Sequence, residues 1–184
     1  MGRIVSSFFI ALDGVVEAPN EWHFPYFDDA MGRVVGASME PTRAFLMGRR
    51  LYDEWSAYWP AQGEEVPFAS HINNLPKYVL THRPVEGEVW RNTTVIGDDA
   101  ERRVRELKES TDGDIGMSGC ATTVRWLLAE GLLDELNLLV HPIAVGHGQR
   151  LFEDTPTTPL ELLSSDALPS GVLHLRYAPA AAAG

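Results

Sequence analysis

Three short segments combine small residues with hydroxyl, imidazole or guanidinium side chains: 47–50 (MGRR), 81–84 (THRP) and 119–123 (GCATT). Each follows an apolar run typical of a buried strand. Glycine lets a ligand approach the backbone closely, a helix start offers free N–H groups to an anion, and arginine matches the planar geometry of phosphate. The candidate anion-binding residues are Gly48, Arg49, Arg50, Thr81, His82, Arg83, Gly119, Cys120, Ala121, Thr122 and Thr123.

Each segment alone also has an ordinary structural explanation. Segment 47–50 could be a solvated helix start, and segment 81–84 a polar loop. Their coincidence is informative because ligands of open α/β sheets bind outside the carboxyl ends of the strands. If the preceding strands are parallel, the segments share one edge and suit an extended ligand with several phosphates. Segment 119–123 is neither the G-x-G-x-x-G fingerprint nor a P-loop, since no lysine follows.

Cys120 is the only cysteine, so the chain cannot form an internal disulfide. A nucleophilic cysteine needs a partner base, and no histidine lies close to Cys120 in the sequence. We therefore expect the backbone of this turn to form the site, with the thiol as a bystander. The six histidines show no H-E-x-x-H or other ligand spacing, so we expect no metal site.

The composition limits the classes of partner. The 184 residues suffice for one domain. The net charge of −11 argues against nucleic acid, whose phosphates favour clustered lysine and arginine. No apolar stretch approaches the length of about 18 residues that a membrane span needs. The N-terminal apolar run is short and lacks a convincing cleavage site. We expect a bacterial cytoplasmic protein.

The hydrophobic pattern predicts an α/β fold. Apolar runs predict strands at 4–12, 43–48, 77–82, 93–97 and 114–119, and amphipathic helical segments lie between several of them. From 134 onwards the segments are strand-like without a long helix, which favours antiparallel closure. We predict one domain, 1–178, with a mixed, mostly parallel central sheet flanked by helices and an antiparallel C-terminal part. Residues 179–184 are predicted to form a disordered tail.

Several motifs in order resemble the dihydrofolate-reductase-like superfamily: FIALDG, LMGRRLYDEW, YVLTHR and IGMSGCATTVRWLLAEGLLDELNLLVHPIAVGHGQRLF. The resemblance is to the branch with the C-terminal reductase domain of bacterial riboflavin-biosynthesis deaminase/reductases, over most of residues 3–177. It implies a central mixed sheet, NADPH as hydride donor and often a homodimer. The deaminase zinc motif is absent from the sequence, so we expect a stand-alone reductase-like domain.

The resemblance also implies residue roles. Gly48 and Arg49 would lie at the adenosine end of NADPH, residues 81–83 at the 2′-phosphate, and residues 119–123 at the pyrophosphate. Ala11, Leu12, Asp13 and Gly14 would border the nicotinamide and the substrate. The chain departs from folate reductases in having Leu51 in place of a threonine, and Gly119-Cys120 in place of Gly-Gly with a cis peptide. Whether that peptide is cis here is left open.

These observations predict an NADPH-dependent reductase that transfers hydride to a small heterocyclic (pterin- or pyrimidine-like) or carbonyl acceptor. Asp13 is the candidate for polarising or protonating the acceptor. Trp22, Phe27 and Asp28 are candidate substrate contacts, although aromatic residues at such spacing also suit a core and Asp28 suits a helix start. A dinucleotide-binding sensor without turnover is the alternative, because no unambiguous proton donor is evident.

Overall fold

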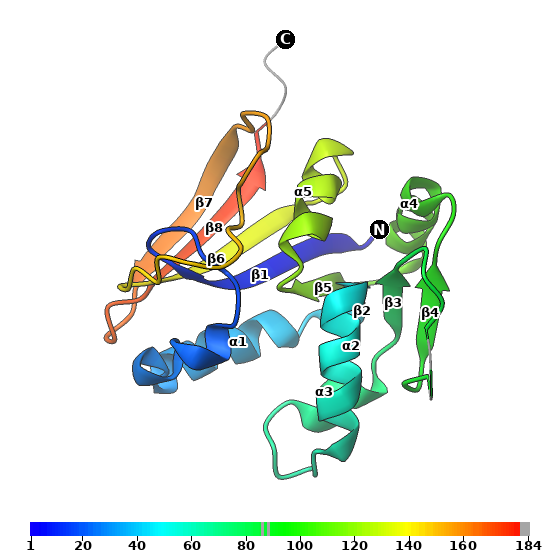
Figure 1. Ribbon diagram of the computed structural model, residues 1–184, viewed down its shortest axis with the longest axis horizontal. Coiled ribbons are helices and arrows are strands. Elements are labelled where there is room, and N and C mark those ends of the chain that lie inside the picture. Colours follow the sequence, from blue (N-terminus) through cyan, green and yellow to red (C-terminus); the bar gives the residue numbers. More distant parts are fainter. Residues whose placement is uncertain (86, 88, 181–184) are drawn as a thin grey trace.

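A computed structural model describes residues 1–85, 87 and 89–180. Its centre is an eight-stranded sheet with the order β4-β3-β2-β5-β1-β6-β8-β7. The first six strands of this order are parallel to one another, and β8 pairs antiparallel with both β6 and β7. This confirms the predicted fold class (Figure 1). The strands are Arg3–Ala11 (β1), Thr42–Gly48 (β2), Lys77–Leu80 (β3), Thr93–Ile96 (β4), Asp114–Ser118 (β5), Glu135–His141 (β6), Leu160–Ala167 (β7) and Leu173–Pro179 (β8).

Helices cover both faces of the parallel part. They are Asp29–Met39 (α1), Arg49–Tyr58 (α2), Ala69–Asn74 (α3), Ala100–Ser110 (α4) and Ala121–Ala129 (α5), with short 3-10 helices at Pro19–Glu21, Phe24–Tyr26 and Trp59–Ala61. Figure 1 shows α5 and α1 on opposite sides of β1. Helix α3 was not predicted from the sequence, because its six residues span too few turns to show a helical repeat.

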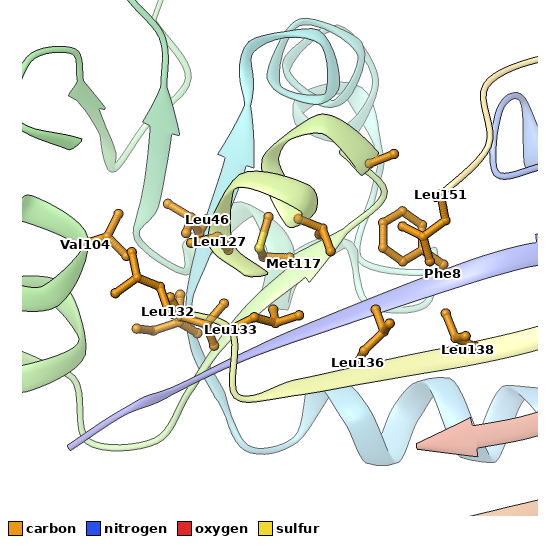
Figure 2. Packing of buried hydrophobic residues seen from close by; sticks show 14 of the residues in the cluster. Phe8, Leu46, Val104, Met117, Leu127, Leu132, Leu133, Leu136, Leu138 and Leu151 are labelled. Atoms are coloured by element: carbon orange, nitrogen blue, oxygen red, sulfur yellow. The ribbon is translucent and has the colours of Figure 1, made fainter. Parts of the chain in front are cut away.

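The main hydrophobic core lies between the sheet and helices α4 and α5. Val104 and Leu107 of α4 and Leu127 of α5 pack in this cluster with Phe8 of β1 and Leu136 of β6 (Figure 2). The alternate side chains of β1, such as Phe9, face the side covered by α1. Both faces of β1 are therefore covered, which explains its nearly continuous apolar sequence.

The C-terminal strands depart from the sequence interpretation in one detail. β6 runs parallel to β1, so the antiparallel part begins only at β8. β8 continues to Pro179, one residue past the predicted domain end at 178, and the N–H of Ala180 donates to the Pro159 carbonyl. The remainder of the predicted tail, 181–184, lies outside the described residues. No helix in the described ranges is long and apolar enough to cross a membrane.

Candidate cofactor and substrate site

The three anion-binding candidates meet at one edge of the sheet. β2 ends at Gly48, β3 ends one residue before Thr81, and β5 ends one residue before Gly119. Because these strands are parallel and adjacent in the order β3-β2-β5, their carboxyl ends share an edge. β1 lies next to β5 and brings Asp13 to the same edge, two residues beyond the strand end. The sheet order thus confirms the geometric premise of the sequence interpretation.

Two helices start at this edge without a side-chain cap. In the described structure, neither Gly48, which precedes α2, nor Cys120, which precedes α5, makes a side-chain capping bond. The first-turn N–H groups of α5 are thus left for an external acceptor. At α2 the N–H of Leu51 is already directed at the Cys120 thiol, so fewer N–H groups are free there. Gly119 and Cys120 both have positive φ, 67° and 62°, so the chain makes a tight left-handed turn between β5 and α5. Two positive helix ends therefore lie side by side.

The thiol of Cys120 links these two helix starts. Its Sγ accepts a hydrogen bond from the N–H of Gly48 at 3.2 Å. Burial raises the pKa of Cys120 to about 11, so the thiol is protonated at neutral pH and is a weak nucleophile. The chemistry of a free thiolate is therefore disfavoured. No peptide bond between described residues is cis, and Gly119–Cys120 is trans.

Arg49, in segment 47–50, is bonded to segment 81–84, the turn that follows β3. Its guanidinium bonds to the Asp53 carboxylate at 2.7 Å and also donates to the carbonyl oxygens of Arg83 (3.1 Å) and Pro84. Its charge is partly neutralised by Asp53, and its bonds to the two carbonyl oxygens hold the turn at 81–84 against the start of α2. Arg50 is bound by Glu17 and Glu54.

The 81–84 turn presents its side chains outwards. The Thr81 hydroxyl accepts the N–H of Arg83 at 3.1 Å, which closes a local turn. Both His82 and Arg83 are exposed. The Nδ1 of His82 lies 3.8 Å from the carboxylate of Asp98. In this turn, Arg83 is thus the exposed cation at the position expected for the 2′-phosphate.

Asp13 holds two loops together. Its Oδ2 accepts the N–H of Gly146 at 2.6 Å, and backbone hydrogen bonds, that of Gly146 foremost, lower the pKa of the carboxyl below its usual value. Asp13 is therefore ionised at neutral pH, which makes it a poor proton donor. Ala11 is buried, whereas Leu12 is largely exposed and its N–H donates to the Ile143 carbonyl.

Gln149 and Arg150, in the loop after β6, lie beside the start of α5 and beside Asp13. They belong to the glycine-rich segment 145–152, which the sequence left open as a turn that lines a ligand or one that only connects strands. Gln149 Nε2 and Arg125 Nη2 both lie 3.4 Å from the hydroxyl of Thr122. Arg150 donates from Nε to the Asp13 carbonyl at 3.1 Å. The glycine-rich segment 145–149 was a possible signal for this contact. The Arg125 position was less visible, because it lies one helical turn into α5.

A cavity of about 280 Å³ lies beside this edge, on the face of the sheet covered by α1. It is lined by helix α1, by the segment from Trp55 to Ile72 and by strands β1, β2, β5, β6 and β8. Phe27, a predicted substrate contact, is part of the lining. Trp22 and Asp28 lie elsewhere. The indole of Trp22 is buried and bonds to the Glu17 carbonyl, and Asp28 caps α1 by accepting the N–H of Met31 at 2.8 Å.

A reductase-type α/β fold is the class that this arrangement defines, and comparisons with known proteins agree. Residues 3–174 match the model of the RibD C-terminal domain, and the chain belongs to this family. A Bacillus subtilis relative named uncharacterized protein YyaP is 28% identical over 180 residues, which cover 95% of this chain and 94% of the relative.

Solved structures share the fold at low sequence identity. A putative riboflavin biosynthesis protein from Shewanella has a TM-score of 0.77 at 18% identity, covering 97% of this chain and 99% of that one. A dihydrofolate reductase from Enterococcus faecalis, solved with NADP(H), has a TM-score of 0.64 at 13% identity, covering 97% and 96%. The resemblance to dihydrofolate-reductase-like proteins stated from the motifs is therefore confirmed.

Proposed function

We propose that this protein is an NADPH-dependent reductase that transfers hydride to a small heterocyclic or carbonyl acceptor. One observation carries the proposal: two uncapped helix N-termini adjoin at the carboxyl edge, directly beside a cavity. Ser118 lines that cavity and is followed at once by the turn 119–120 that starts α5. A ligand with phosphates at the helix ends would thus reach the cavity with its other end.

The residues at the edge fit a phosphorylated dinucleotide. The free N–H groups at the start of α5 and the hydroxyl of Thr122 suit the pyrophosphate. The start of α2 after Gly48, together with Arg49, suits the adenosine end, and Arg83 suits the 2′-phosphate. Arg50, Thr81, His82, Cys120, Ala121 and Thr123 complete the proposed cofactor contacts, and Ala11 and Leu12 border the nicotinamide end.

When bound, NADPH supplies a hydride to an electrophilic carbon of the acceptor, and a proton from solvent completes the reduced product. The chain contributes position and exclusion of water. Helix α1 and the aromatic residues Phe27 and Trp55 enclose the cavity, so the acceptor lies against the sheet away from bulk solvent. Asp13, our candidate for the catalytic centre, acts as an anion that holds Gly146 and the loop that follows β6.

We also propose that the protein is a homodimer. Leu162 and Leu163 on the edge strand β7 are 52% and 47% exposed. Two large apolar side chains exposed on a sheet edge are uncommon in a monomer and favour a contact with a second copy of the chain. Light scattering tests this, with a double variant Leu162→Lys/Leu163→Lys expected to be monomeric. A monomeric wild type under assay conditions would contradict it.

Calorimetric titration with NADPH, followed by assays of NADPH oxidation with pterins, pyrimidine ribitols and quinones, tests the proposed function. We expect micromolar binding and oxidation with at least one acceptor. Absence of binding would exclude the proposal. Binding without oxidation by any acceptor would favour the second candidate, a dinucleotide sensor, which the ionised state of Asp13 supports because it leaves no evident proton donor.

A further inference from the structure

Three uncharged polar side chains form a row across the floor of the cavity. The sheet register pairs Ser7 of β1 with Ser118 of β5 on one side and with Asn137 of β6 on the other. Paired residues of neighbouring strands project to the same face, and all three line the cavity. We call Ser118, Ser7 and Asn137 the polar row.

The polar row has hydrogen-bonding capacity that the protein does not use. Asn137 is only 8% exposed, and its Oδ1 has no hydrogen-bond partner among the described residues. Two other hydroxyls of the lining are already bound, because Ser38 donates to the Val35 carbonyl and Thr42 to the Ser38 carbonyl. A buried amide oxygen without a partner is costly, so a ligand that binds it gains affinity.

The rest of the lining is uncharged. Among the described residues around the cavity there is no aspartate, glutamate, lysine or arginine, and His174 is the sole titratable side chain. Burial and the nearby Arg176 lower the pKa of His174, which favours its neutral form. Arg176 itself is bound by Glu135, with Nε–Oε1 at 2.7 Å. An ionic ligand would therefore enter the cavity without a counter-charge, at a large desolvation cost.

From these observations we propose, on the basis of the reductase function above, that the substrate is an uncharged planar ring. It has one or more polar atoms along one edge to meet the polar row, and its faces contact apolar and aromatic walls. The small volume suits a mono- or bicyclic molecule. Asn137 is the main specificity-determining residue. Protonated pterins and phosphorylated or carboxylated rings are disfavoured, because no side chain of the lining would balance their charge.

Three probes with one bicyclic ring and different charge test this proposal: naphthol, naphthoate and naphthyl phosphate. Calorimetry on the protein without cofactor should give naphthol at least about tenfold tighter binding than either anion. Equal or tighter binding of an anion, or no naphthol binding, would overturn the substrate class. NADPH is titrated separately, so failure of the cofactor proposal is distinguished from failure of this one.

Asn137→Leu tests the polar row, since it keeps the volume and removes the amide. We expect naphthol to bind about tenfold more weakly, NADPH binding to be unchanged, and the melting temperature to rise because an unpaired buried oxygen is gone. A purely structural Asn137 would instead give a lower melting temperature and unchanged naphthol affinity, which would contradict the assignment.

A matched pair of serine variants provides the control. Ser7 faces the cavity, whereas the adjacent Ser6 is buried without a hydrogen-bond partner and alternates to the other face of β1. Ser7→Ala should weaken naphthol binding several-fold, and Ser6→Ala should not change it. Equal effects of the two substitutions would contradict the polar row even if Asn137→Leu did not fold.

Discussion

The N–H of Gly48 donates a hydrogen bond to Sγ of Cys120 over 3.2 Å, which joins the start of α2 to the start of α5. Gly48 also packs closely against Thr123 of α5, since a Cβ atom on Gly48 would lie 2.7 Å from Oγ1 of Thr123. The two helix starts therefore have little freedom to separate. The spacing of the two sets of free N–H groups is set by this packing before any ligand binds.

Substituting Cys120 should separate its structural role from any chemical one. Cys120→Ser keeps an acceptor for the Gly48 N–H, so we expect NADPH affinity close to that of the wild type. Cys120→Val has no acceptor and adds a β-branch at positive φ, so it should lower the free energy of unfolding by about 2 kcal/mol. Urea unfolding and calorimetry measure both effects. Loss of turnover but not of binding in Cys120→Ser would contradict a structural role.

The Cys120 thiol should react slowly with iodoacetamide in the native state. Its pKa of about 11 leaves little thiolate at neutral pH. The rate should rise with pH towards about 11, because deprotonation creates the nucleophile. The unfolded protein in urea, with an ordinary thiol, is the control and should react much faster at neutral pH. Rapid native labelling at neutral pH would show that the thiol is activated.

Arg83 should determine the preference for NADPH over NADH. Arg83→Ala should weaken NADPH binding by about tenfold, because a charge-assisted contact with the 2′-phosphate is lost, and should leave NADH binding unchanged. Arg33→Ala on α1, which also removes one exposed arginine, controls for the change in net charge. Selectivity that persists in Arg83→Ala would place the 2′-phosphate elsewhere.

Lys77 should make stability depend on pH in the alkaline range. Its side chain is fully buried, its Nζ lies 4.1 Å from the Trp90 ring centre, and burial lowers its pKa from 10.5 to about 8. Between these two values the unfolded chain holds a proton that the folded chain has released. Stability from this group therefore rises with pH across that window, by about 3 kcal/mol.

Urea unfolding at several alkaline pH values measures this contribution of Lys77. Other groups also titrate there, so the informative quantity is the difference between the wild type and Lys77→Met, which cannot lose a proton. The difference should change steadily from about pH 8 to 10.5. A difference that does not depend on pH would show that Lys77 keeps an ordinary pKa.

The sequence was sufficient for the fold because strand and helix periods alternate clearly. Segment 4–10 of β1 is apolar on both faces except at Ser6 and Ser7, and glycine marks the turn at Gly119. The direction in which each strand pairs was harder to predict from the sequence. Segment 135–141 has the same strand-like pattern as the antiparallel strands β7 and β8 that follow it, and only the three-dimensional structure shows that β6 runs parallel to β1.

The parts of the candidate site that depend on short sequence motifs could be predicted. The parts that depend on how residues of neighbouring strands are paired could not. Strand-end glycines and arginines are visible in the sequence. The polar row joins Ser7 to Ser118 and Asn137, both more than a hundred positions away from it in the sequence, and its existence depends on strand order. For Asp28 the sequence left two roles open, a substrate contact and a helix start, and the structure shows that its side chain caps α1.

Amide hydrogen exchange with and without NADPH tests the central claim most directly. The first-turn N–H groups of α5, at 121–123, have no capping side chain in the described structure and should exchange fast in the free protein. We predict that saturating NADPH slows exchange at 119–123 and at the start of α2, and leaves α1 unchanged. Exchange at 119–123 that stays the same at saturating NADPH would contradict the account.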